Sequence, residues 1–309
     1  MNGKTILVAG GSGFIGQLLC PKLIQAGFKV INADLVDCKQ TDVKFQKIDI
    51  TKKRQLEILF TNDKINYVVN LVSLLHSASR LDPIKATITN IIGTTRLLEK
   101  SYKFGIELFM QASSTCALGE QGSPQKPVTE DTLALPVDIY GETKRYIEKL
   151  GSVLSDMHDF TFIAARLPLI VGAGQPTRTS AWRMEIFNKL CKGGKIRFGF
   201  HEDEIIPLAP VEDVAEHLFK LITVENLKGH IYHTPYEAWL VRNLIQTIEE
   251  IGENLVITSG DKKVKGGPVY VSWDKIKCDL GLQKPSLKQR LIDYKNYLIN
   301  KNFKGEIHG

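Results

Sequence analysis

Long apolar runs are missing from this sequence, and cysteine is scarce. No apolar segment approaches the roughly 20 residues that a membrane-spanning helix needs, and the opening "KTILVAG" lacks the basic and apolar regions of a signal peptide. The five cysteines are odd in number, far apart and without a CxxC pair: Cys20, Cys38, Cys116, Cys191 and Cys278. Such spacing favours neither a disulfide framework nor a zinc site. We therefore expect a cytoplasmic protein with no membrane partner and no metal site.

Charge of one sign is not concentrated anywhere either. The net charge is +6, and the lysines are scattered, with short basic runs at "TKKR" (51–54) and "DKKVK" (261–265). Runs this short are typical of a solvated surface rather than of a nucleic-acid interface. With 43% hydrophobic and 24% charged residues over 309 positions, the chain has the composition of a folded protein with one large or two smaller domains.

What the sequence does contain is an alternation of short apolar runs with helical stretches. Strands are predicted at 5–10, 29–34, 43–49, 67–73, 106–114 and 160–167. Helices are predicted at 14–27, 53–63, 83–105 and around Tyr140. Continuous apolar strands separated by helices predict a doubly wound α/β fold, in which helices cover both faces of a parallel sheet.

Beyond about residue 172 this alternation breaks down. A loop-rich piece at 173–206 precedes a helix that begins "VEDVAEHLFKLI" and returns to the sheet, and the helices at 241–252 and 286–300 belong to a smaller C-terminal lobe. We predict two domains, which consist of residues 1–172 plus about 207–235, and of residues 173–206 plus 236–309.

Glycines mark the turn between the first strand and the first helix, "GGSGFIG". Gly10 would permit the tight turn, Gly13 would let the backbone approach a pyrophosphate, and Gly16 would let the helix pack closely on the strand. The helix N-terminus then offers N–H groups and a positive dipole to an anion. A glycine trio alone is weak evidence, but its place in the first strand–turn–helix unit predicts a dinucleotide site.

Carboxylates stand at the ends of the second and third strands. Asp34 falls near the position where a carboxylate accepts hydrogen bonds from the adenosine ribose, and it would repel a 2′-phosphate, so NAD is favoured over NADP. Asp37 is a rival for this role. Asp49 ends the third strand and is a candidate to face the adenine ring, although a plain turn aspartate has the same pattern.

Tyr140 and Lys144 in "DIYGETKRYIEK" are four residues apart, so they lie on one face of the predicted helix. This spacing suits a tyrosine whose hydroxyl is made more acidic by a nearby cation, but also an ordinary amphipathic helix. Tyr297 and Lys301 repeat it near the C-terminus with nothing catalytic around them. The spacing alone does not decide between the two interpretations.

Several motifs together are more specific. In chain order they are "GGSGFIG", "VVNLVS", "TNIIGTTRLLE", "SSTCALG", "YGETK", "ARLPLIVG" and "VEDVA". With them the chain resembles the extended short-chain dehydrogenases/reductases, in the NAD-dependent epimerase/dehydratase family, over roughly residues 5–225. The resemblance implies a Rossmann fold, NAD as cofactor in the larger domain and a substrate-binding smaller lobe.

The resemblance also implies a set of site residues. The catalytic residues would be Ser114, Tyr140 and Lys144, with Ser113 and Thr115 as neighbours that a shift in register would substitute for Ser114. Tyr140 would accept the proton of the substrate hydroxyl, Lys144 would lower the pKa of that tyrosine, and Ser114 would orient the reacting oxygen. The cofactor would be bound by Gly10, Gly13, Phe14, Ile15, Gly16, Asp34, Asp49, Ile50, Leu71, Val72, Asn90, Tyr140 and Lys144.

Three departures from the family narrow the reaction. Thr115 and Cys116 replace the Asp–Glu pair of the dehydratases, so dehydration is not expected. Gly174 stands where epimerase-reductases that make GDP-fucose have a histidine, which leaves Cys116 as a small apolar residue beside the cofactor. Ile206 stands near the position of the arginine that clamps a diphosphate in nucleotide-sugar 4-epimerases, and this weakens that interpretation.

The segment at 172–187, "GAGQPTRTSAWRMEIF", is similar to the substrate loop of D-erythronate dehydrogenases and, more distantly, of L-threonine dehydrogenases. Arg178 and Arg183 would bind a substrate carboxylate, and hydroxyls such as that of Ser180 would bind substrate hydroxyls. The alternative is that both arginines are surface residues and Trp182 is a core side chain. Thr115 and His76 are further candidates for substrate contacts, with a structural histidine as the alternative for His76.

We therefore predict an NAD-dependent oxidoreductase that moves a hydride from a secondary hydroxyl of a small sugar-acid or polyol substrate. The alternatives are a UDP-hexose 4-epimerase with tightly bound NAD and a dinucleotide-binding sensor or scaffold without turnover. Family members often form homodimers through a four-helix bundle. The apolar residues that allow this here, although they equally suit burial against the sheet, are Ile88, Ile91, Ile92 and Leu98.

Overall fold

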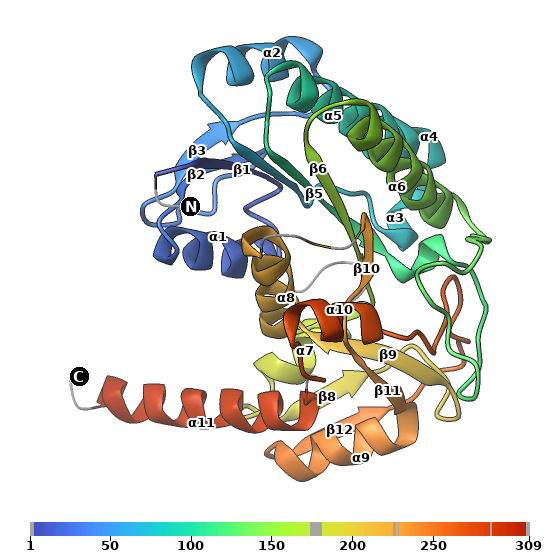
Figure 1. Ribbon diagram of the computed structural model, residues 1–309. Coiled ribbons are helices and arrows are strands. Elements are labelled where there is room, and N and C mark those ends of the chain that lie inside the picture. The colour runs from blue at the N-terminus through green and yellow to red at the C-terminus, as the bar shows by residue number, and fades with distance from the viewer. Residues whose placement is uncertain (1–2, 174–180, 225–226, 228, 285, 307–309) are drawn as a thin grey trace. The chain divides into compact units, whose positions relative to one another are not determined.

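The computed structural model describes residues 3–173, 181–224, 227, 229–284 and 286–306 (Figure 1). The chain forms two compact units. Unit 1 consists of Met1–Leu167, Val214–Thr234 and Gly266–Leu282, and unit 2 consists of Pro168–Asp213, Pro235–Lys265 and Gln283–Gly309. The segment Gly266–Leu282 thus belongs to a different unit from its sequence neighbours on both sides.

The strands of unit 1 are β1 (Thr5–Ala9), β2 (Lys29–Asp34), β3 (Lys44–Lys47), β4 (Tyr67–Asn70), β5 (Leu108–Ser114), β6 (Thr161–Leu167) and β10 (Ile231–His233). Its helices are α1 (Gly16–Gln25), α2 (Lys53–Asn62), α3 (His76–Leu81), α4 (Pro83–Ala86), the π-helix η1 (Thr87–Gly93), α5 (Thr94–Lys103), the 3₁₀-helix η2 (Thr115–Ala117), α6 (Ile139–Met157) and α10 (Asp274–Leu280). Helix α8 (Val211–Thr223) begins in unit 2 and continues in unit 1.

The seven strands of unit 1 form one parallel sheet in the order β10-β6-β5-β4-β1-β2-β3. The chain runs outward from β1 through β2 and β3 and then returns to β4 on the other side of β1. Ligands of doubly wound folds bind where the strand order reverses, at the carboxyl ends of the strands. The predicted fold is confirmed, and the carboxyl ends of β1 and β4 mark the expected place of a cofactor.

Helices α2, α5 and α6 cover one face of this sheet, and α1 and α10 lie on the other (Figure 1). The core under the first group is built from strand side chains that point toward the helices. It includes Leu7, Ile31, Val68, Phe109 and Phe162 from the strands and Leu56, Leu97 and Ile147 from the helices. These side chains are buried because they come from apolar runs that are covered on both faces. The packing fixes α6, which carries Tyr140 and Lys144, against β5 and β6.

The helix predicted at 83–105 is divided in the structure. A π-helix, Thr87–Gly93, separates α4 from α5, and Gly93 lies against Ile50, whose side chain would be 2.9 Å from a Cβ at that position. The short helix α3 after β4 was not predicted. The piece predicted to be loop-rich, 173–206, contains a helix, a strand and the first residues of a second strand among its described residues.

Unit 2 has two small sheets. Its elements are β7 (Leu169–Val171), α7 (Trp182–Asn188), β8 (Gly194–Arg197), β9 (Ile205–Pro210), β11 (Glu237–Leu240), α9 (Val241–Ile251), β12 (Leu255–Thr258) and α11 (Leu287–Glu306). The sheet orders are β11-β9-β7 and β12-β8, and α7, α9 and α11 supply apolar side chains to the core between them. No helix in the described parts of either unit has the length and apolar character to cross a membrane.

Candidate active site

The glycine turn after β1 is fixed by close backbone approaches. Gly10 has a φ of +82°, and a Cβ there would lie 3.1 Å from the backbone nitrogen of Val72. A Cβ on Gly16 would lie 2.4 Å from the carbonyl oxygen of Gly11, and one on Gly11 would lie 2.6 Å from Oδ1 of Asn32. Gly11 is therefore as constrained as the three predicted glycines, and the doubled glycine in "GGSG" was the sequence signal for it.

No side chain caps the first turn of α1, although the N–H groups of Gln17 and Leu18 already donate to the carbonyls of Gly13 and Ile15. Ile15 occupies the N-cap position. Backbone N–H groups at a helix N-terminus without a side-chain cap suit a phosphate oxygen. The constrained glycines keep side chains out of this place, so the residues present fit the pyrophosphate of a dinucleotide.

Asp34, the last residue of β2, accepts a hydrogen bond from this turn. Its Oδ2 accepts a hydrogen bond from the N–H of Ser12 at 3.1 Å, and Oδ1 accepts one from the N–H of Leu35 at 2.6 Å. The rival, Asp37, caps the exposed N–H of Lys39 instead. The structure therefore brings Asp34, rather than Asp37, to the glycine turn.

Asp49, Leu71 and Val72, which are also predicted to contact the cofactor, lie in loops that follow the strands. Asp49 accepts hydrogen bonds from both the N–H and the hydroxyl of Thr51, at 2.9 and 2.7 Å, so its Oδ1 caps a local turn. Leu71 donates its N–H to the carbonyl of Ala9 at 2.8 Å. The loop after β4, including Val72, thus adjoins the glycine turn.

Asn90 lies on the π-helix and is buried. Its amide accepts from the N–H of Leu74 at 2.8 Å and donates to the carbonyl of the same residue at 3.0 Å. It also donates to the hydroxyl of Thr143 on α6 at 3.2 Å. Asn90 therefore ties the loop after β4 to the helix that carries Tyr140.

The hydroxyls of the two serines at the end of β5 have different hydrogen-bond partners. The hydroxyl of Ser113 donates to the carboxylate of Glu148. The hydroxyl of Ser114 instead accepts from the N–H of Cys116 at 3.2 Å and caps η2. Because successive side chains of a strand point to opposite faces, Ser114 is the better candidate for a substrate contact. Thr115, the other neighbour, is buried.

Helix α6 begins immediately before Tyr140. Asp138 caps it, accepting from the N–H of Gly141 at 2.8 Å. One turn further on, Lys144 donates from Nζ to the carbonyl of Ala112 on β5 at 2.8 Å, and this nitrogen lies 5.6 Å from the centroid of the Tyr140 ring. Burial lowers the pKa of Lys144 to about 8, an effect that the Glu148 carboxylate partly offsets.

The two tyrosines that are followed by a lysine four residues later differ in how deeply they are buried. Tyr140 is 8% exposed, whereas Tyr297 on α11 is 56% exposed. A cation in a dry environment shifts the pKa of a neighbouring group far more than one in water. The surroundings of Tyr140, and not those of Tyr297, suit an acid–base role.

His76 lies beside this pair at the start of α3. Its Nε2 is 2.6 Å from Oδ2 of Asp138, and its ring meets that of Tyr140 edge to face, with centroids 6.4 Å apart. Partial burial alone would raise the pKa of Asp138, but His76 and the Gly141 N–H hold that pKa below its usual range. A Cβ on Gly266 would lie 3.4 Å from the side chains of both Asp138 and His76. The "GG" at 266–267 therefore lies at the edge of the site, a position that was not predicted from the sequence.

Only part of the predicted substrate loop is described. Arg178 and Ser180 lie outside the described residues, as does Gly174. Arg183 is on α7 in unit 2, where its carbonyl accepts from the N–H of Gly172 at 3.2 Å. Ile206, at the position of the clamping arginine, is fully buried in the core of unit 2.

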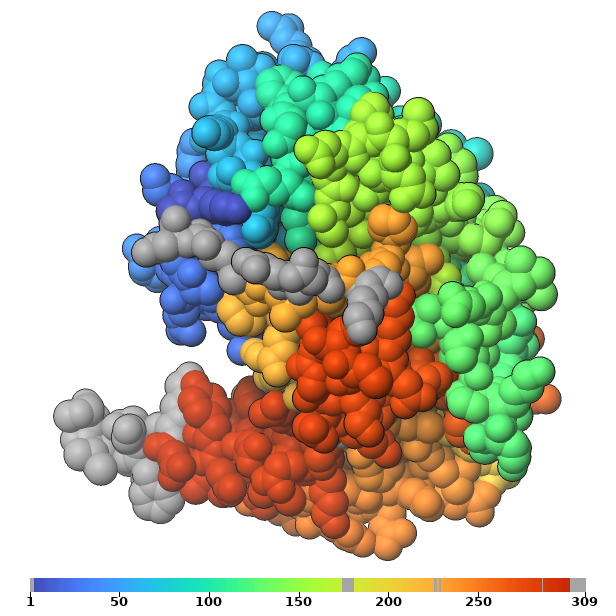
Figure 2. Space-filling view, viewed as in Figure 1, coloured from blue at the N-terminus to red at the C-terminus, as the bar shows by residue number. Residues whose placement is uncertain are grey.

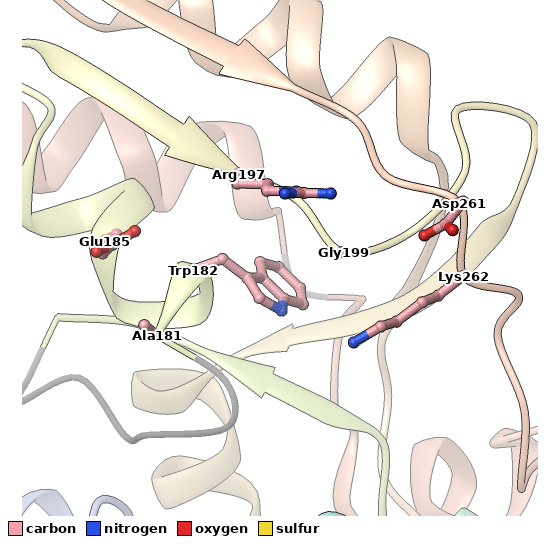
Figure 3. A pocket seen from close by; sticks show the side chains of 7 residues that line it. All are labelled: Ala181, Trp182, Glu185, Arg197, Gly199, Asp261 and Lys262. Carbon is pink, nitrogen blue, oxygen red and sulfur yellow. The ribbon is translucent and has the colours of Figure 1, made fainter.

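Unit 2 contains a pocket of about 360 Å³ near the start of α7 (Figure 3). Two cations and two carboxylates line it, together with the indole of Trp182, which packs on Phe198 at a centroid distance of 4.6 Å. The lining residues are Ala181, Trp182, Glu185, Arg197, Gly199, Asp261 and Lys262. No group of three or more metal-ligating side chains occurs among the residues that the structure describes.

A parallel sheet with a constrained glycine turn at its reversal point, and a buried Tyr–Lys pair beside a serine-ended strand, is the architecture of the short-chain dehydrogenases/reductases. Comparison with known proteins identifies the branch. Residues 6–233 match the model of the NAD dependent epimerase/dehydratase family, and the chain belongs to that family. Its cofactor is therefore NAD.

The relatives include two kinds of enzyme. A UDP-glucose 4-epimerase from Halalkalibacterium halodurans is 30% identical over 173 residues, which are 54% of this chain and 51% of the relative. The mitochondrial L-threonine 3-dehydrogenase from Bos taurus is 23% identical over 265 residues, 82% of this chain and 70% of the relative. The matches to the epimerases span about half of their length.

The solved structures with a similar fold also include both kinds of enzyme. A UDP-glucose 4-epimerase from Thermotoga maritima superposes with a TM-score of 0.83 at 23% identity, covering 96% of this chain and 99% of the other. An L-threonine dehydrogenase from Cupriavidus necator superposes with a TM-score of 0.84 at 20% identity, covering 94% of this chain and 98% of the other. At these identities the likeness is one of fold.

Proposed function

We propose that this protein is an NAD-dependent oxidoreductase that removes a hydride from a secondary hydroxyl of a small sugar-acid or polyol substrate. The observation that carries the proposal is the buried Tyr140 beside Lys144, in the unit that also holds the glycine turn and Asp34. When bound, NAD⁺ supplies the hydride acceptor.

The chain's own residues would manage the proton. Tyr140 is the group that takes the hydroxyl proton as the C–H bond of the same carbon breaks, leaving a ketone. With a pKa of about 8, Lys144 is mostly protonated at pH 7, and its charge favours the phenolate form of Tyr140. Ser114 would hydrogen-bond the reacting oxygen, and Gly10, Gly11 and Asp34 would hold the cofactor.

Features of unit 2 support a small substrate rather than a nucleotide sugar. A diphosphate is bound by cations that offset its desolvation, and the fully buried Ile206 offers none. In the pocket of Figure 3, the charges of Arg197 and Lys262 are balanced by those of Glu185 and Asp261. We infer that unit 2 is the substrate lobe and that Arg183, with Arg178, binds a substrate carboxylate.

The second candidate is a UDP-hexose 4-epimerase, which the names of several curated relatives favour. Its chemistry would begin with the same proton transfer to Tyr140. The two functions differ in the fate of the hydride, which an epimerase returns to the opposite face of the ketone and a dehydrogenase releases as NADH. A sensor or scaffold without turnover is less well supported, because it has no need for the buried Tyr–Lys pair.

The deciding experiment is a substrate panel of aldonic acids, hydroxy-amino acids and UDP-hexoses. We expect NADH to accumulate, seen by its absorbance, with an aldonic or similar hydroxy acid, in proportion to the substrate consumed. Formation of a UDP-hexose epimer without net NADH would instead establish the epimerase. The Tyr140→Phe variant is the negative control for both functions, since it should show neither reaction.

We also propose a homodimer. Ile84, Ile88 and Ile92 recur every four residues on α4 and η1 and are exposed, whereas Leu98 is buried under the sheet. On α6, Tyr146 and other large side chains are exposed as well. The chain around α6, yellow-green at the upper right of Figure 2, lies at the surface of unit 1 in this view. Together with the isoleucines of α4 and η1, this exposed surface suits the four-helix contact common in the family.

A further inference from the structure

A buried ion pair lies one helical turn beyond Lys144. Glu148 on α6 and Arg166 on β6 are each 3% exposed. Arg166 donates from Nε to one carboxylate oxygen at 3.0 Å and from Nη2 to the other at 2.8 Å. This two-pronged geometry is the strongest form of an arginine–carboxylate contact, and it fixes the Glu148 carboxylate in one orientation.

Two further side chains complete the cluster. The hydroxyl of Ser113 donates to Glu148, and Nη1 of Arg166 lies 3.2 Å from Nε2 of His233. The other ring nitrogen of His233 lies 2.8 Å from the carbonyl of Ser272. Burial, reinforced by Arg166, lowers the pKa of His233 to about 4, so at neutral pH its Nε2 accepts and its Nδ1–H donates.

Stability alone does not account for such a cluster. Replacing a buried ion pair by apolar side chains of similar volume is often neutral or stabilising, because both charges lose their hydration. The position of this pair is more informative. Glu148 follows Lys144 by four residues and Tyr140 by eight, so all three share one face of α6, and its partner Ser113 precedes Ser114.

Lys144 needs a nearby anion, because a buried ammonium is costly unless it is paired. The titratable groups around it are Tyr140 and Glu148 on its own helix and Cys116 on η2; Arg166 on β6 reaches it through Glu148. Burial raises the pKa of the Cys116 thiol, which is therefore neutral at pH 7. Of these groups, Glu148 is the only carboxylate, and the two-pronged contact with Arg166 fixes it in place.

We propose that Glu148 is a positioning residue of the active site: its carboxylate, held by Arg166 and Ser113, keeps the Lys144 ammonium charged and anchors the serine end of β5 to α6. The inference rests on the role proposed above for Lys144. Glu148 does not touch the substrate; it acts through Lys144 and through the neighbour of Ser114.

The test is the titration of Lys144 itself, without cofactor or substrate. Protein labelled with ¹³C at the lysine ε-carbon is titrated by NMR, and the Lys144 signal is assigned from its loss in Lys144→Arg. In Glu148→Gln, which keeps the shape of the side chain, we expect the pKa of Lys144 to be about one unit lower, a roughly tenfold larger dissociation constant. Glu142→Gln, at a half-exposed position of the same helix, is the matched control and should leave the signal unchanged.

A second variant guards against misfolding, because Glu148→Gln leaves Arg166 buried without its partner. The double variant Glu148→Gln/Arg166→Gln removes both charges, and we expect Lys144 to titrate below the wild type in it too. A Lys144 titration equal to that of the wild type in either folded variant would overturn the proposal. Since the readout needs no turnover, a failed substrate panel would not affect it, and an active enzyme with an unmoved Lys144 would reject this inference alone.

Discussion

The ammonium of Lys144 lies 5.6 Å from the centroid of the Tyr140 ring, one turn further along α6, and both side chains are buried. A positive charge held this close to a phenol, away from water, favours the phenolate. In the proposed mechanism, this arrangement would let a tyrosine, whose ordinary pKa is about 10, accept a proton near neutral pH.

Replacing Tyr140 by phenylalanine should remove the proton acceptor and leave the ring's packing in place. We expect turnover to fall by about 10²- to 10⁴-fold, the usual contribution of a positioned acid–base group, with NADH affinity changed little. Tyr297→Phe is the matched control, since it has the same spacing to a lysine but is exposed. Steady-state rates and NADH fluorescence titration measure the two effects, and a Tyr140→Phe enzyme of near wild-type rate would contradict the mechanism.

The sheet and the glycine turn were predictable because their signals are local. Apolar runs give strands, and a glycine trio at a strand–helix turn gives the cradle. The π-helix at Thr87–Gly93 was not predictable, since one extra residue in a turn barely alters the pattern of apolar residues. Contacts between distant residues, such as His76 with Asp138 and Glu148 with Arg166, depend on how strands and helices are brought together, and no pattern within a short window shows them.

The two serines at the end of β5 should differ in what they affect. Ser114→Ala should lower kcat/KM by about 10²-fold or more if its hydroxyl bonds the reacting oxygen. Ser113→Ala should mainly lower stability, by about 1–3 kcal/mol, because it removes a buried hydrogen bond to Glu148. Rates and urea unfolding of both variants make the comparison. A larger loss of kcat/KM from Ser113→Ala would mean that Ser113, and not Ser114, carries the catalytic hydroxyl.

Asp34 should determine the choice of cofactor. Its carboxylate lies at the glycine turn and accepts from the N–H of Ser12, where it would repel the 2′-phosphate of NADP. We expect Asp34→Asn to weaken NADH binding about tenfold and to narrow the gap between NADH and NADPH. Asp37→Asn, at the rival carboxylate, should alter neither. Dissociation constants from fluorescence titration test this, and an effect confined to Asp37→Asn would reverse the assignment.

The proposed homodimer depends on exposed isoleucines. Ile88 and Ile92 are 42% and 40% exposed, and we expect Ile88→Lys/Ile92→Lys to convert a dimer into a monomer because charges are costly in an apolar interface. Val256→Lys, an exposed site on β12 of unit 2, is the control and should stay dimeric. Light scattering after size-exclusion chromatography gives the masses. A wild-type chain that elutes as a monomer of 34.6 kDa would refute the dimer.

His233 should make the protein sensitive to acid. Its pKa is lowered from 6.5 to about 4 by burial and by Arg166, so between these values the unfolded chain binds a proton that the folded chain does not. Stability should therefore be unaffected by this group above pH 6.5, fall as the pH drops from 6.5 to about 4, and level off below that.

The loss would amount to about 3.5 kcal/mol at most, from roughly 1.4 kcal/mol per pKa unit. In His233→Gln, which cannot take up a proton, we expect the free energy of unfolding to depend less on pH across this window, even if the variant is less stable at pH 7. His230→Gln is the matched control, because His230 is partly exposed beside Asp156. Urea unfolding at several pH values, with hydrogen exchange of β6 and β10 amides, measures the slope. Since burial and Arg166 together keep His233 neutral, an unchanged slope in His233→Gln would mean that the charge on this cluster is arranged differently from the way the structure indicates.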